Sequence, residues 1–271
     1  NAWYQKYKDQ GLEIIGVHTP EFEFEKKYDN VKQAVKDEHI EYPVVLDNDY
    51  ATWNAYANRY WPHKYLIDID GFIVYDHICE GAYGETEQKI QESLEERMRV
   101  FQMQGRLEKG AAQPKNVTVV DSSKVGSQEI YFGASRNHFL GNGQPGKSGV
   151  QLFTEPSRVD LNKLYFSGSW NIRDQFAENT RAGDMITFKY RAKNVYFVAS
   201  SADNVRIKIL LDNKPLGQEA GSDIAQDGSS SVLIKDARLY KLIEDPAGYG
   251  EHVLEIIIEK PGMRIFTFTF G

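Results

Sequence analysis

The sequence predicts an α/β domain followed by an all-β sandwich. Apolar strand patterns alternate with helical patterns over residues 1–104, and short strands separated by Gly, Asn, Asp and Pro fill residues 117–271. Between them, residues 105–116 contain Gly, Ala and Pro without either pattern, as is typical of a linker. The 271 residues are therefore expected to divide into two domains of ordinary size.

Strands and helices follow one another in the first domain. The opening residues predict a helix that Gly11 ends, because glycine is common just past a helix C-terminus. Residues 12–18 form a mostly apolar run, which predicts a strand covered on both faces. The next expected elements are a helix with Tyr28, Val31 and Val35 on one face, a strand over residues 43–47, and a short helix that Asn48 or Asp49 caps.

A hairpin and a long helix close the first domain. The run YWPHKYLIDIDG at residues 60–71 contains an apolar strand and ends in an Asp-x-Asp-Gly turn, and residues 72–76 form a second strand. In the closing helix, four apolar residues lie at helical spacing on one face: Ile90, Leu94, Met98 and Phe101.

Period-two alternation dominates the second domain. Residues 205–209 place their apolar members on one face, and residues 266–270 alternate Phe with Thr. Turn residues occur at 212–215 and 260–262. About ten short strands without a convincing helix predict a two-sheet β-sandwich.

Charge and composition exclude several classes of protein. The chain has 39 acidic and 32 basic residues, a net charge of −7, and residues 1–104 alone have 20 acidic against 11 basic residues, or −9. Nucleic acid binding needs a basic surface, so no nucleic acid partner is expected. No apolar run approaches the roughly 18 residues of a membrane span. The six histidines are scattered without metal-ligand spacing, and we expect no metal or other cofactor.

The stretch at residues 60–71 resembles the proline loop and terminal hairpin of thioredoxin-fold proteins, in the membrane-tethered subgroup that serves cytochrome c maturation. This resemblance implies a thioredoxin-like fold for the first domain. It also implies a cis peptide bond between Trp61 and Pro62, which an X-Pro bond tolerates at low cost. In that fold the proline faces a redox Cys-x-x-Cys pair.

The cysteine content departs from that family. Cys79 is the single cysteine, so the chain has no Cys-x-x-Cys and cannot form an internal disulfide. A lone strand cysteine is most simply a small buried residue. The chain starts at Asn1 with a helix already in progress, whereas in the family that helix begins at the redox cysteines and follows a strand. We therefore expect a fragment whose redox cysteines lie upstream. The alternative is a complete chain without redox chemistry.

The order of the domains resembles the soluble C-terminal region of DipZ-type thiol-disulfide proteins of cytochrome c biogenesis. The local matches are GVHTPEF at residues 16–22, NAYANRYWP at 54–62 and RLYKL at 238–242. The resemblance implies an extracytoplasmic, membrane-tethered protein with a membrane electron-transfer domain and a thiol or disulfide protein partner. For the second domain it implies a jelly-roll sandwich similar to carbohydrate-binding modules.

Five residues are predicted neighbours of the redox site. Pro62 would offer main-chain groups to a partner segment, Trp61 would cover the redox sulfurs or a partner side chain, and His63 is a candidate local base. After the hairpin, Glu80 is placed to handle a proton during thiol exchange, and Gly81 would let the partner approach closely. The plainer alternatives are a core Trp61, a solvated His63 and an exposed strand-end Glu80.

The second domain offers candidates for binding a polysaccharide. Sugar rings pack on aromatic faces, and Trp170 is the strongest candidate because the Ser-Gly-Ser before it indicates a strand end. Tyr131 and Tyr196 belong to the same aromatic set, and Arg173 could bind sugar hydroxyls. Each aromatic residue is alternatively part of the sandwich core.

The resulting hypothesis is the extracytoplasmic part of a membrane-linked thiol-disulfide oxidoreductase, inactive without its upstream cysteines. Two alternatives stay open at this point. One is a non-catalytic module that binds glycan or protein on a thioredoxin-like scaffold. The other is a peroxiredoxin-like peroxidase, whose reactive cysteine would also lie upstream.

Overall fold

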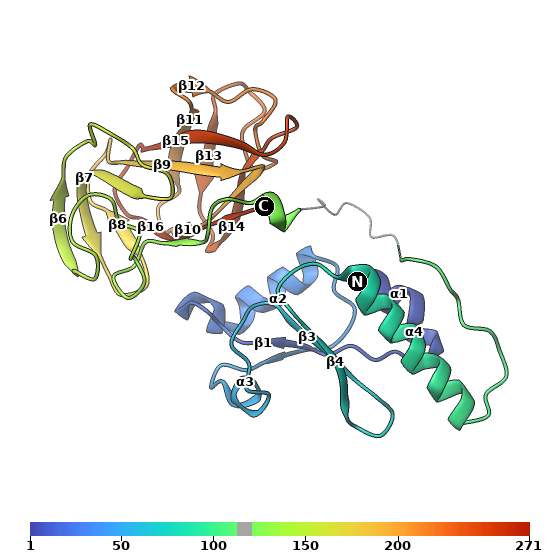
Figure 1. The fold of residues 1–271 in the computed structure, drawn as a ribbon. Coiled ribbons are helices and arrows are strands. Elements are labelled where there is room, and N and C mark those ends of the chain that lie inside the picture. Colours follow the sequence, from blue (N-terminus) through green and yellow to red (C-terminus); the bar gives the residue numbers. More distant parts are fainter. Residues whose placement is uncertain (113–120) are drawn as a thin grey trace. The chain divides into compact units, whose positions relative to one another are not determined.

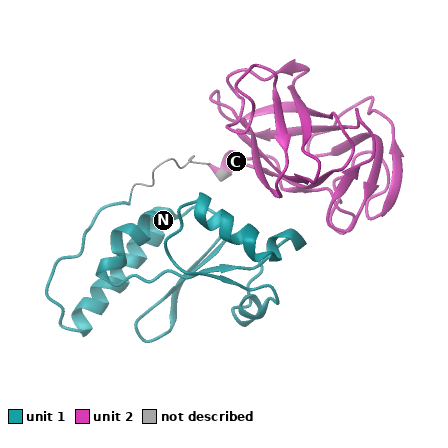
Figure 2. Cartoon of the chain, turned by 180° about the vertical axis from the view of Figure 1, so that it is seen from behind, with its two compact units in different colours: residues 1–119 teal, residues 120–271 magenta. Residues whose placement is uncertain are grey.

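The computed structural model describes residues 1–112 and 121–271. The chain divides into two compact units, residues 1–119 and 120–271 (Figures 1 and 2). The first unit contains helices and short strands, and the second consists almost entirely of strands. None of the helices in the described part of the chain combines the length and apolar character that a bilayer crossing requires.

The first unit alternates helices and strands in the order that the sequence predicts. Its elements are α1 (Ala2–Tyr7), β1 (Gly16–His18), α2 (Tyr28–Asp37), β2 (Val44–Leu46), α3 (Ala51–Ala55), β3 (His63–Ile67), β4 (Ile73–Ile78) and α4 (Tyr83–Val100). Short 3-10 turns cover Lys8–Gln10 and Glu23–Lys26. Gly11 follows the first of these turns with a φ of 104°, a left-handed conformation that glycine adopts without strain.

The strands of this unit form two separate two-stranded sheets. β1 pairs with β2 in parallel, and β3 pairs with β4 in an antiparallel hairpin. The expectation of a strand covered on both faces at residues 12–18 is wrong, because Ile15 is 64% and Val17 44% exposed. Only residues 16–18 of that run pair with a neighbouring strand.

A small apolar core joins α1 to α4, which lie side by side in Figure 1. Its buried members are Tyr7, Leu12, Ile90, Leu94 and Leu107. Met98 packs against this cluster, as its spacing predicts. Phe101 does not, because it follows the last residue of α4 and is 61% exposed.

Glu87 on α4 fixes the chain that leaves the first unit. Its buried carboxylate accepts hydrogen bonds from the Tyr7 hydroxyl at 2.7 Å and the Ala112 amide at 2.8 Å, and pairs with the Lys6 ammonium at 3.0 Å. Lys6 also donates to the Gly110 carbonyl. The first unit therefore includes residues 107–112, which the sequence had assigned to the linker.

Asp47 caps α3, in place of the predicted Asn48 or Asp49. Its carboxylate accepts the amides of Thr52 at 2.9 Å and Trp53 at 2.8 Å, and the Thr19 hydroxyl at 3.1 Å. Burial acts to raise the pKa of Asp47, but these hydrogen bonds outweigh it and leave the pKa lowered. The cap was missed because Asp47 precedes the helix by more residues than a simple N-cap does.

The second unit is one large antiparallel sheet of twelve strands. Its strands are β5 (Ile130–Tyr131), β6 (Gly149–Phe153), β7 (Leu164–Ile172), β8 (Ala177–Asn179), β9 (Met185–Ala192), β10 (Asn194–Ser201), β11 (Val205–Leu211), β12 (Lys214–Pro215), β13 (Ser231–Ile234), β14 (Arg238–Glu244), β15 (Gly250–Ile258) and β16 (Met263–Phe270). A short 3-10 turn, Ser122–Lys124, precedes them. The main path runs β12-β11-β15-β9-β7-β8-β16-β10-β14 and does not close on itself.

β7 connects the two halves of this sheet. Its first part pairs with β9, and its second part pairs with β6 and β8. The pairing partners of β7 change at Gly168. There φ is 92°, and an added Cβ would lie 2.0 Å from Oδ1 of Asp184. Asp184 in turn accepts the amides of Ser169 and Thr180. Glycine is therefore required at this bend.

Both halves contribute side chains to one hydrophobic core. Phe188 on β9 and Phe268 on β16 are fully buried, with ring centroids 5.7 Å apart. Trp170 on β7 lies in the same core, with its ring centroid 4.5 Å from that of Phe166. The second unit thus buries far more apolar surface than the first.

The Glu87 network makes the stability of the first unit depend on pH. Burial acts to raise the pKa of Glu87, but hydrogen bonds from Tyr7, Ala112 and Lys6 together leave it below the ordinary value of 4.5. Since a depressed pKa contributes stability that is lost as pH falls, Glu87→Ala should destabilise the unit above pH 4.5. The expected loss is about 1–3 kcal/mol, because the mutation leaves buried donors without an acceptor.

Urea denaturation at neutral and acidic pH measures this effect. Wild type and Glu87→Ala should converge at acidic pH. The control is Glu92→Ala, which removes an exposed carboxylate of the same helix and should change stability little. Equal losses for the two variants at neutral pH would contradict the assigned role of Glu87.

Candidate functional site

The Pro62 loop connects α3 to β3. The Trp61–Pro62 peptide bond is cis, which confirms the expectation from the resemblance. The Pro62 carbonyl accepts the Cys79 amide at 2.7 Å, so the loop is tied to the end of β4. Trp61 donates its indole N–H to the Thr19 carbonyl at 3.0 Å and is 46% exposed. Its ring centroid lies 4.2 Å from that of Trp53.

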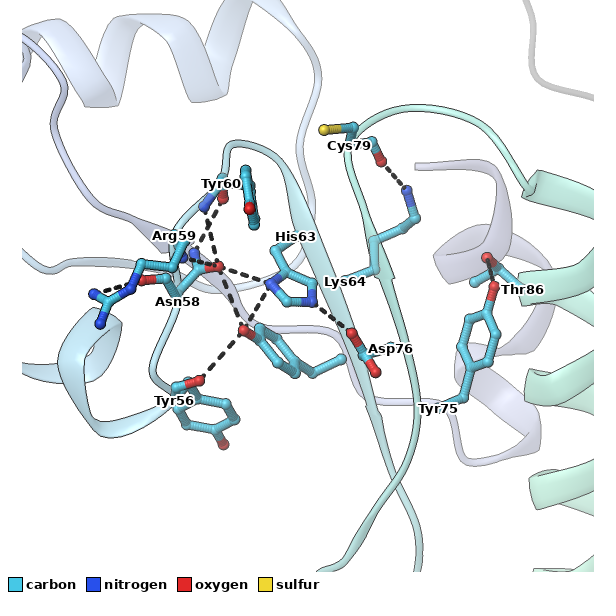
Figure 3. Close-up of polar contacts among 11 residues, drawn as sticks. Tyr56, Asn58, Arg59, Tyr60, His63, Lys64, Tyr75, Asp76, Cys79 and Thr86 are labelled. Carbon is cyan, nitrogen blue, oxygen red and sulfur yellow. Dashed lines mark hydrogen bonds and ion pairs between the residues drawn. The ribbon is translucent and has the colours of Figure 1, made fainter.

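His63 is held on both sides of its ring (Figure 3). Its Nδ1 lies 2.7 Å from Oδ1 of Asn58 and 2.7 Å from the Tyr65 hydroxyl. Its Nε2 lies 2.8 Å from Oδ2 of Asp76. The side chain is only 9% exposed. Because side chains of the same unit engage both nitrogens, His63 is not the solvated residue that the sequence offered as an alternative.

Sequence reasoning missed the three residues that hold His63. Asn58 also accepts the Arg59 amide at 2.9 Å, so it joins the loop to the imidazole. Asp76 lies opposite Tyr65 in the hairpin, and its carboxylate reaches His63, which lies two residues before Tyr65 on β3. In the sequence, the signal for this contact was a charged residue, Asp76, within an otherwise apolar strand pattern. The sequence alone does not show which residue Asp76 contacts, because that depends on how the two strands pair.

Residues 79–82 form the second edge of the site. Cys79 is exposed and has a φ of 65°, so the expectation of a buried cysteine is wrong. Lys64 donates its ammonium to the Cys79 carbonyl at 2.9 Å (Figure 3). Glu80 is exposed and accepts the Tyr83 hydroxyl, and Gly81 has a φ of 104°, which favours glycine. The structure therefore brings the predicted Glu80–Gly81 segment next to Pro62.

Burial changes two pKa values at this edge. It lowers the pKa of Lys64, while the charges of Glu80 and Cys79 act in the opposite direction. It also raises the pKa of Tyr83, and the Glu80 carboxylate adds to that shift.

A groove of about 1140 Å³ lies beside the Pro62 loop. Its walls include β1, β3, the Pro62 loop and one face of α4. Four exposed apolar residues line it: Ile15, which precedes β1, and Val17, Val45 and Ile67 of the two sheets. Tyr56, Tyr60 and Trp61 add exposed aromatic rings.

Backbone groups on two sides of this groove are unpaired. β1 pairs only with β2, and β3 pairs only with β4. Each strand therefore has one edge without a neighbouring strand in the described part of the chain. Exposed strand edges are a template for another strand.

Of the four residues predicted to bind sugar, Trp170 is the one that the structure buries completely. Trp170 is fully buried and donates its indole N–H to the Ser167 carbonyl, which corrects its assignment as an exposed platform. Tyr131 is half-buried beneath the Arg136 guanidinium, 3.7 Å from its ring centroid. Tyr196 is half-buried on β10, and Arg173 is exposed just beyond β7.

No group of His, Cys, Asp and Glu side chains within residues 1–112 and 121–271 has the arrangement of a metal site.

The fold and the Pro62 site define a thioredoxin-like protein with a β-rich C-terminal unit. Residues 127–271 match the model of the family described as Thioredoxin like C-terminal domain. The chain belongs to this family.

Similarity to curated proteins covers both units. Protein DipZ of Mycobacterium tuberculosis is 32% identical over 272 residues, which is 100% of this chain and 36% of DipZ. The chain thus spans about a third of the length of that relative. Thiol-disulfide oxidoreductase ResA of Bacillus cereus is 33% identical over 91 residues, 34% of this chain and 50% of ResA.

Similarity to solved structures is remote. A family two carbohydrate esterase from Cellvibrio japonicus aligns with a TM-score of 0.33 and 15% identity, over 53% of this chain and 33% of the esterase. A likeness at this level carries no argument about function.

Alanine variants of two tryptophans test whether each side chain is buried or partly exposed. Trp170→Ala should destabilise the second unit by about 3–5 kcal/mol, because it opens a large cavity in the core. Trp61→Ala should cost the first unit less, since nearly half of Trp61 is already exposed. Urea denaturation followed by circular dichroism measures both. A Trp170→Ala variant as stable as wild type would show that its burial is wrong.

Proposed function

We propose that this chain forms the partner-docking part of a thiol-disulfide oxidoreductase, with the redox Cys-x-x-Cys on a further segment of the same protein. In the reaction, one thiolate attacks the partner disulfide and forms a mixed disulfide. The second thiolate then displaces the partner, so the dithiol is oxidised and the partner disulfide is reduced by two electrons. The similarity to ResA and DipZ supports this reaction class.

The divided sheet is the observation that carries the proposal. β1 and β3 each have an unpaired edge, and apolar side chains line the groove beside them. One extended strand in the groove would pair with both edges and unite the two sheets. Its apolar residues would cover Ile15, Val17 and Ile67. A segment that ends this strand with the redox cysteines would place them beside the Pro62 loop.

The Pro62 loop would then dock the partner. An extended partner segment can pair with main-chain groups next to Pro62. Trp61 and Tyr60 are about half exposed at this edge and would contact apolar partner side chains. The His63 contacts to Asn58 and Asp76 hold the loop in place for this role.

The second unit would act as an accessory domain. Its two-part sheet around a single core supports a jelly-roll sandwich as the proposed architecture. The resemblance to DipZ-type proteins supports the further proposal that the protein lies outside the cytoplasm, tethered to a membrane electron-transfer domain. Glycan binding has no specific support in this unit, because its strongest candidate residue, Trp170, is buried.

The proposal predicts opposite results for two forms of the protein. This chain alone should reduce insulin with dithiothreitol no faster than dithiothreitol does. The longer protein that includes the segment before Asn1 should accelerate the reaction. Its gene should encode two cysteines separated by two residues. A single upstream cysteine would instead favour a peroxidase, and none would leave a binding scaffold.

A matched pair of variants tests the groove in the longer protein. Val17→Lys places a charge where the docked segment would bury it, so insulin reduction should fall at least about tenfold. Val74→Lys is the control, because Val74 is the same residue type, is 50% exposed, close to the 44% of Val17, and does not line the groove. Equal activities of the two variants would contradict strand docking at this site.

A further inference from the structure

β6 is an exposed edge strand of the second unit. It pairs only with β7, so its other edge has no neighbouring strand in the described part of the chain. Val150 is 70% and Leu152 75% exposed, whereas Phe153 is buried in the core. An exposed edge with apolar side chains is an unusual feature, because natural sheets normally protect such edges.

The sequence around β6 is complementary to itself. When two copies of KSGVQLFTE, residues 147–155, lie antiparallel with Gln151 opposite Gln151, Val150 of one copy faces Leu152 of the other. Just beyond the strand residues 149–153, the same register brings the segment with Lys147 of one copy next to the segment with Glu155 of the other, at both ends. Opposite charges and apolar pairs are the cross-strand contacts that stabilise antiparallel sheets.

Neither charge is neutralised within residues 1–112 and 121–271. In the described residues, Lys147 and Glu155 are exposed and take part in no ion pair. Glu155 instead lies near another acid, since burial and then the Glu155 charge raise the pKa of Glu255. A lysine from a second copy would therefore relieve repulsion between two carboxylates.

We propose that β6 pairs with β6 of a second copy of this chain, in the antiparallel register centred on Gln151. The contact is isologous, so each copy uses the same surface, and it joins the sheets of two second units into one. With five residues in each strand, the interface is small, and the dimer is expected to be weak and dependent on concentration.

Charge reversal tests this register on the full chain. Lys147→Glu or Glu155→Lys alone places two pairs of like charges across the interface and should weaken dimerisation about tenfold in sedimentation equilibrium. The double variant exchanges the charges and should restore the wild-type dimer. The matched control is Lys260→Glu, an exposed change away from β6 that should have no effect.

Cross-linking provides a second readout. In a Cys79→Ser background, Gln151→Cys places two cysteines opposite each other at about 4.5–5.5 Å between Cα atoms, which suits a disulfide. Oxidation should cross-link this variant, and Leu233→Cys on β13, 47% exposed, should stay monomeric. A strictly monomeric wild type, failure of the double variant to restore dimers, or equal cross-linking at both positions would overturn the proposal.

Discussion

The need to pair backbone hydrogen-bonding groups governs the first unit. Buried amide and carbonyl groups require partners, and a strand edge meets that need only through another strand or through solvent. β1 and β3 both have an open edge towards one groove, and the side chains around it are apolar. Solvent can hydrate the edges, but it cannot cover Ile15 and Val17 favourably. An added strand in this groove would therefore supply both the missing backbone partners and a cover for the exposed apolar side chains.

Three independent contacts fix the loop that borders this groove. The Pro62 carbonyl is tied to Cys79, Trp61 reaches Thr19, and Asn58 and Asp76 hold His63 from both sides. These partners come from the loop after β1, the segment after α3, the β4 strand and Cys79, which follows β4. A loop that several elements hold loses little further entropy on binding, which makes it a suitable docking edge.

Local sequence signals predicted the order of elements and the Pro62 hairpin, because turn residues and periodicity act within a few positions. They failed where distant residues decide the outcome. Phe101 follows the apolar spacing of α4 but lies beyond the helix end. Trp170 lies inside β7, because the strand does not end at Gly168 but continues to Ile172. The role of Asp76 depends on hairpin register, and that of Asp47 on a cap several residues away. Neither contact leaves a periodic signal.

The two units differ in how much core they have. In residues 1–112 six large hydrophobic side chains are buried, whereas the second unit has one extended cluster of fully buried aromatic and aliphatic residues. Folding entropy scales with the number of ordered residues, so a unit with so few buried side chains is only marginally stable. An occupant of the groove would cover exposed apolar residues on both small sheets at once. Docking of that segment and folding of the first unit are therefore expected to be thermodynamically coupled, while the second unit folds on its own core.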